Sequence, residues 1–107
     1  EIINRWHVEQ YAYLLNRLKS IREGDGTLLD RSMILFGSGL RDGDRHSPKN
    51  IPIVVAGRGG GTVKTGRHLV FEPETPLANL YLAMLNTMGV EASQFGDSTR
   101  EMSEIYV

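Results

Sequence analysis

Ser32-Met33-Ile34-Leu35-Phe36 is a short, almost wholly apolar run, and Ile51-Pro52-Ile53-Val54-Val55-Ala56 is a second. Their length and β-branched residues favour strands, and Pro52 is tolerated near the start of a strand. Because apolar residues follow one another instead of alternating with polar ones, both faces of each strand should be covered. The two runs therefore predict an α/β layer fold, with helices on both faces of a sheet.

A long helix is predicted before these strands, over residues 3–23, because apolar residues recur there every three or four positions. The predicted buried stripe contains His7, Tyr11, Leu14, Leu18 and Ile21. Gly24-Asp25-Gly26 should end the helix, since glycine tolerates the left-handed conformation found at helix ends.

A second helix is predicted after the strands, with Thr75 as its cap, Pro76 in its first position and Gly89 at its end. Its predicted buried stripe contains Leu77, Leu80, Tyr81, Met84, Leu85 and Met88. Residues 68–71 are a possible third strand, and the polar tail, residues 91–107, is predicted to be loosely ordered.

Two main helices and two or three strands are too few for a complete covered sheet. We therefore interpret residues 1–107 as one C-terminal segment of a larger α/β domain, with the missing strands upstream. The remainder of its own chain is then the first partner expected for this segment.

The amino-acid composition of the chain excludes several classes of function. Twelve basic and thirteen acidic residues leave a net charge of −1, which offers no electrostatic footprint for nucleic acid. The chain has no cysteine, which excludes disulfides and thiolate metal sites, and no apolar run long enough for a membrane span.

Three potential metal ligands, Asp42, Asp44 and His46, directly follow the first predicted strand. Ligand sites of open α/β sheets lie outside the carboxyl ends of the strands. Carboxylate and imidazole ligands suit a divalent metal, and we consider zinc, manganese, iron and calcium. The alternative is a solvated turn, because aspartate and glycine are common turn residues.

Other polar residues are weaker candidates. Arg67 could bind an oxyanion bidentately and His68 could act as a ligand or an acid–base group, but the sequence favours an ordinary surface pair. His7 needs a polar partner if its stripe is buried, more often a carbonyl than a metal. The amides of Gly57-Arg58-Gly59-Gly60-Gly61 offer an anion cradle or simply a flexible loop.

Several stretches together resemble one family. They are Asn4–Gln10, Glu23–Asp30, Gly37–Gly43, Asn50–Pro52 with Ala56-Gly57, Gly66–His68, Thr75–Leu80 and Phe95–Ser98. In this order they are similar to the C-terminal part of the HXXSHH family, the domain of unknown function DUF1552 of planctomycetes and related bacteria. The motif that names the family lies upstream of this part of the family pattern.

The resemblance implies an alkaline-phosphatase-like α/β/α sandwich, related to the sulfatases, in a protein exported from the cytoplasm. It implies that Asp42 and His46 are loop ligands of a bimetal site and that His68 is the late histidine. Pro48 and Lys49 stand where many relatives carry further histidines, and Asp44 stands where many have asparagine.

Two functions from different classes follow. One is a metal-dependent hydrolase of phosphate or sulfate esters, small or polymeric, in which two metals clamp the ester. The other is a non-catalytic extracytoplasmic module that binds a partner or acts as a scaffold. In either case we expect residues 1–107 alone to be inactive, because two or three ligands do not close a bimetal site.

Overall fold

The computed structural model describes all of residues 1–107 and has a mixed α/β fold with two helices and four strands. The elements are α1 (Ile2–Ser20), β1 (Arg22–Glu23), β2 (Gly26–Thr27), β3 (Ile34–Gly37), β4 (Ile53–Ala56), a 3-10 helix (Gly59–Gly61), α2 (Ala78–Thr87) and a second 3-10 helix (Ser103–Ile105). None of the helices is long and apolar enough to span a lipid bilayer.

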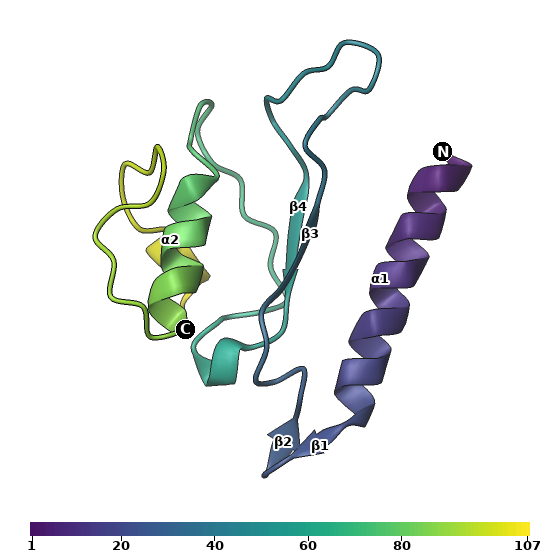
Figure 1. Cartoon of the computed structure of the whole chain (residues 1–107), viewed down its shortest axis with the longest axis vertical. Helices are drawn as coiled ribbons and strands as arrows, with labels where there is room; N and C mark the ends of the chain where they lie inside the picture. Colours follow the sequence, from purple (N-terminus) through teal and green to yellow (C-terminus); the bar gives the residue numbers. More distant parts are fainter.

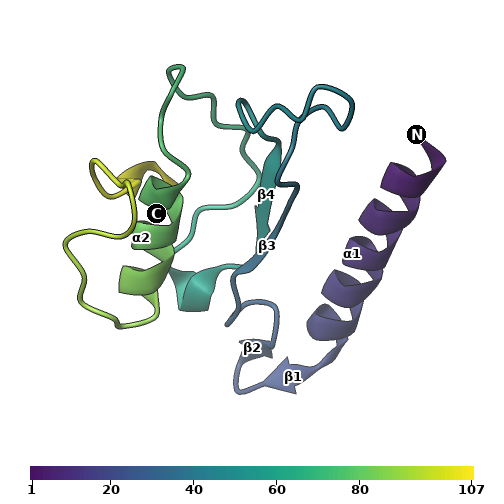
Figure 2. The same cartoon turned by 45° about the horizontal axis from the view of Figure 1, so that its top comes forward.

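The β3–β4 hairpin lies between the two main helices (Figure 1; Figure 2). The strands are antiparallel, with Leu35 opposite Val55 and Phe36 opposite Val54. Phe36 stacks on a tyrosine of α1, whereas Leu35 and Val55 pack against the core beside α2. The prediction of two strands is therefore confirmed, with each strand starting two residues later than expected. Their faces are only partly covered, since no residue of either strand is fully buried and Val54 is 51% exposed.

The first helix is confirmed but ends at Ser20, before the predicted glycine stop. Ile21 has an extended backbone, and the next residues form β1, which pairs with β2 across a tight turn. Gly24 has a φ of 60° in this turn. The glycines therefore turn a small hairpin and do not end the helix.

The predicted stripe of α1 is partly wrong. Tyr11 and Leu18 are half-buried as expected, together with Leu15, but His7 and Leu14 are exposed. No residue of α1 is fully buried. The physical reason is that a two-stranded hairpin is narrow and covers only a thin strip of the helix.

The core lies between α2, the hairpin and the C-terminal tail. Its fully buried cluster contains Leu80, Ala83, Met102 and Ile105. The predicted stripe of α2 is wrong at Met88, which is 71% exposed, and it omits Leu82, which is among the most buried residues. The tail covers a face of α2 that a one-sided amphipathic pattern assigns to solvent.

The predicted ends of α2 differ in outcome. Gly89, with a φ of 85°, ends the helix as predicted. The Val90 N–H donates to the Leu85 carbonyl at 3.0 Å, and the Gly89 N–H donates to the Asn86 carbonyl at 3.1 Å. These two bonds form a Schellman motif. The prediction for Thr75 is wrong, because its hydroxyl donates to the Glu72 carbonyl and Leu77 occupies the cap position.

The prediction of a loose tail is wrong. Met102 donates its N–H to the Asn79 carbonyl, and the chain end pairs with residues 62–64 through bonds from Val107 to Thr62 and from Lys64 to Ile105. Met102 and Ile105 are spaced to bury one side of the tail, although the tail is mostly polar. Residues 68–71 form no strand, which corrects that prediction as well.

Candidate functional site

The connection between β3 and β4 carries Asp42, Asp44 and His46. The Asp42 carboxylate Oδ1 accepts the backbone N–H of Asp44 at 3.0 Å and that of Arg45 at 3.3 Å. Asp42 and Ser47 form an isolated bridge, which closes the loop upon itself. Asp42 is therefore the residue that builds this turn, as the alternative interpretation of the sequence required.

The backbone of His46 has a φ of 50°, a conformation uncommon for a residue with a side chain. Its ring Nδ1 lies 3.2 Å from the Asp44 carbonyl oxygen. A carbonyl oxygen only accepts, so this contact is a hydrogen bond in the tautomer with its proton on Nδ1, and in that tautomer Nε2 has the free lone pair. The exposed imidazole is thus oriented as metal-binding histidines are.

The Arg67 side chain forms hydrogen bonds to the backbone of two separate segments. Its Nη2 donates to the Glu104 carbonyl at 2.7 Å, and its Nη2 and Nε both reach the Lys64 carbonyl. These bonds tie the loop after the 3-10 helix to the C-terminal tail, so only Nη1 is left to meet an anion. The neighbouring His68 is exposed in a segment without regular structure.

His7 lies on the exposed surface of α1, where its ring meets Trp6 edge-on with 5.1 Å between ring centroids. The structure brings no three His, Asp or Glu side chains into a group that could hold a metal ion. The side chains predicted to bind metal, Asp42, His46 and His68, therefore do not lie together in such a group.

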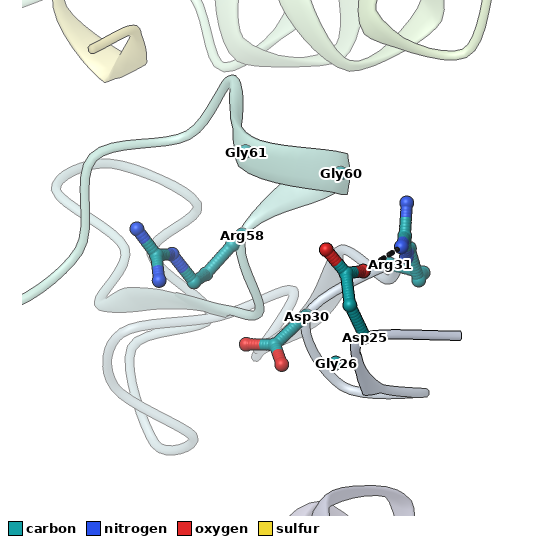
Figure 3. A pocket seen from close by; sticks show the side chains of 7 residues that line it. All are labelled: Asp25, Gly26, Asp30, Arg31, Arg58, Gly60 and Gly61. Carbon is teal, nitrogen blue, oxygen red and sulfur yellow. Dashed lines mark hydrogen bonds and ion pairs between the residues drawn. The ribbon is translucent and has the colours of Figure 1, made fainter. Parts of the chain in front are cut away.

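A polar cavity of about 290 Å³ lies where the loop after β2 meets the glycine-rich segment after β4 (Figure 3). The sequence did not predict it, although Asp25-Gly26 and the glycine-rich segment both border it. Its lining contains no hydrophobic residue and consists of Asp25, Gly26, Asp30, Arg31, Arg58, Gly60 and Gly61.

Most charged side chains of this cavity form hydrogen bonds or ion pairs with the surrounding loops. Arg31 pairs with Asp25 at 2.8 Å, and the Asp30 carboxylate accepts the N–H and the hydroxyl of Thr27. The bonds from Thr27, followed by the positive charges of Arg58 and Arg31, hold the pKa of Asp30 below its usual value. Asp30 therefore stays ionised as a structural acceptor near neutral pH.

The amides of Gly59, Gly60 and Gly61 bind carbonyl groups of the chain itself. Gly59 donates its N–H to the Ser32 carbonyl, Gly60 to that of Asp30 and Gly61 to that of Arg58. The glycines dock this segment against the loop before β3. Three of the five amides proposed for an anion cradle in residues 57–61 are therefore already engaged within the chain.

The fold and this surface define a small mixed α/β domain whose polar residues mostly build turns. Comparisons with protein-family models, with curated proteins and with solved structures find no match.

Proposed function

We propose that this chain is a non-catalytic binding or scaffold module of an exported bacterial protein of the HXXSHH type. The observation that carries the proposal is the engagement of Asp42. Its Oδ1 already accepts two backbone N–H groups, and Asp42 belongs to no group of three or more His, Asp or Glu side chains that could hold a metal ion. Because the Asp42 carboxylate stabilises its own loop, we assign it a structural role.

The hairpin between two helical layers supports an alkaline-phosphatase-like α/β/α sandwich as the context of the module. Each strand of the hairpin pairs only with the other, so both outer edges are open to additional strands. Open edges pair readily with further β-structure. On this proposal the upstream remainder of the chain adds strands at those edges, and the module contributes loops to a larger surface.

A metal-dependent hydrolase of phosphate or sulfate esters is the second candidate, favoured by the orientation of His46. His46 is exposed in the loop that follows β3, and its Nδ1 lies against the Asp44 carbonyl oxygen. In such an enzyme His46 and His68 would be ligands and a bound metal would polarise the ester. Two histidines do not complete a metal site, so the remaining ligands would have to come from outside residues 1–107.

Calorimetric titration of the full-length protein, in which residues 1–107 are joined to the upstream remainder of the chain, with Zn²⁺ or Mn²⁺ distinguishes the two functions. The module predicts no stoichiometric binding and no turnover of aryl phosphate or aryl sulfate esters. Stoichiometric binding that is lost in His46→Ala and retained in His7→Ala would favour the hydrolase, because His7 is an exposed histidine outside the loop.

A further inference from the structure

The chain exposes much more surface than a compact protein of its size. Its accessible surface is 7950 Å² for a mass of 11.9 kDa, where about 6,000 Å² is typical of a folded monomer. Its radius of gyration is 15.0 Å, against about 13 Å for a compact chain of this length. The excess, about 2,000 Å², exceeds the roughly 800 Å² that each partner buries in a stable interface.

Several exposed apolar side chains lie on one face of α1. Five apolar side chains of this face are between 45% and 87% exposed: Ile2, Ile3, Trp6, Tyr13 and Leu14. At about 100° per residue they span an arc of about 120°, which also contains Gln10 and Arg17 and is centred about 130° from the strip formed by Tyr11, Leu15 and Leu18. Exposed apolar patches of this kind mark interaction sites.

This face points away from the sheet. The opposite strip of α1 contacts the hairpin, where Tyr11 stacks on Phe36, and α1 forms an outer layer of the molecule (Figure 1; Figure 2). Strands added at the open hairpin edges would extend the sheet beneath α1 and leave its outer face uncovered. A different occupant is therefore needed for the outer face.

The face is complementary to itself. Gln10 lies near its middle, with Ile3 and Trp6 toward one end and Tyr13 and Leu14 toward the other. A two-fold axis near Gln10 would bring Trp6 of one helix opposite Leu14 of the other, and the reverse, as a closed symmetric interface requires.

The charges of α1 favour the antiparallel orientation. Residues 1–10 carry a net charge of −1 and residues 11–20 a net charge of +2, since Arg17 and Lys19 lie in the last turn. Antiparallel helices set each acidic half against a basic half and also oppose their dipoles. Parallel helices would set like charges together.

We propose that α1 pairs with α1 of a second copy of this chain, antiparallel about a two-fold axis near Gln10. The apolar outer face of α1 is thus a homodimer interface. This pairing is independent of the function proposed above, because the interface contains none of the loop residues.

Sedimentation and fluorescence test the dimer together. The expected mass is twice the 11.9 kDa of one chain, and emission of the single tryptophan, Trp6, shifts to the blue as concentration rises. Leu14→Glu should weaken dimerisation at least about tenfold, because it sets a carboxylate into both halves of an apolar interface. Val70→Glu is the matched control, since Val70 is 85% exposed outside α1.

Cysteine cross-linking determines the relative orientation of the two α1 helices, and it does so even if Leu14→Glu folds poorly. The chain has no cysteine of its own, so single replacements react cleanly. Gln10→Cys should form a disulfide-linked dimer on mild oxidation. Ile3→Cys should not, because an antiparallel pair separates the two copies of residue 3 by about 21 Å, beyond disulfide reach.

Three results would overturn the proposal. One is that the chain is a monomer at 100 μM and that its tryptophan emission is the same in Leu14→Glu. A second copy of the chain would then not be the partner of this face. Another is cross-linking of both cysteine variants, which means parallel helices. The third is a dimer that survives Leu14→Glu and is lost in Val70→Glu, which places the interface elsewhere.

Discussion

Tyr11 stacks on Phe36 with 5.0 Å between the ring centroids and 25° between the ring planes. The Tyr11 hydroxyl also donates a hydrogen bond of 2.7 Å to the Ile34 carbonyl. These contacts hold α1 against β3, although the rest of the helix is largely exposed. One aromatic side chain thus supplies both packing and a polar tie between two layers of the fold.

Replacing Tyr11 by phenylalanine should release part of this attachment. The ring stack remains, but the Ile34 carbonyl loses its partner, and we expect a loss of about 1 kcal/mol in the free energy of unfolding. Urea denaturation measures the loss, and hydrogen exchange should show faster exchange in α1. Tyr13→Phe is the control, because Tyr13 is 65% exposed, and an equal loss in both variants would contradict this role.

Gly57→Ala should destabilise the fold strongly. Gly57 has a φ of 97°, and a Cβ there would lie 2.1 Å from the Ser32 carbonyl oxygen and 2.9 Å from that of Leu29. Backbone must move to relieve this clash, so we expect a loss of about 3 kcal/mol or more by thermal or urea denaturation.

Gly43→Ala is the matched control for this position. No atom lies within 4 Å of a Cβ built at Gly43, and its backbone is not left-handed. Its effect should stay within about 0.5 kcal/mol. Equal effects of the two variants would argue against the tight approach of residue 57 to the loop before β3.

Asn79→Ala should loosen the C-terminal tail. The Asn79 side chain is almost completely buried; its Oδ1 accepts the Thr99 N–H at 2.9 Å and its Nδ2 donates to the Thr99 hydroxyl. Alanine leaves those groups without partners, which should cost about 2 kcal/mol. Limited proteolysis should then cut the tail faster than in Asn16→Ala, an exposed control, and equal cleavage would contradict this anchoring.

Stability should fall at alkaline pH because of two tyrosines. Partial burial raises the pKa of Tyr11, and burial together with the Glu101 carboxylate raises that of Tyr106, above the usual 10.0. The unfolded chain therefore ionises first. The stabilisation is complete below about pH 10 and is lost as the pH rises through the folded-state pKa values.

The measurement compares urea midpoints at pH 9 and pH 11. Tyr11→Phe combined with Tyr106→Phe should show a smaller drop between the two pH values than the unmodified chain. Tyr13→Phe should show the full drop, because Tyr13 is largely exposed. A double variant that drops as steeply as the unmodified chain would exclude these two hydroxyls as the cause.

The candidate site could be predicted only in part. The cluster of Asp42, Asp44 and His46 was evident from spacing, but its role as a turn depends on the bonds that Asp42 accepts from Asp44 and Arg45. The cavity beside Asp25 and Arg58 was missed because its walls come from loops that are distant in the chain. Local patterns carry no information on which loops meet.

The sequence by itself determined the two strands, the two helices and the glycine that ends α2, because period, chain length and the left-handed preference of glycine act over a few residues. Only the tertiary structure decided which side of α1 is covered and that Met102 and Ile105 complete the core. Burial of these residues depends on partners far away in the chain. Contacts between distant segments therefore decided the outcomes that local periodicity left open.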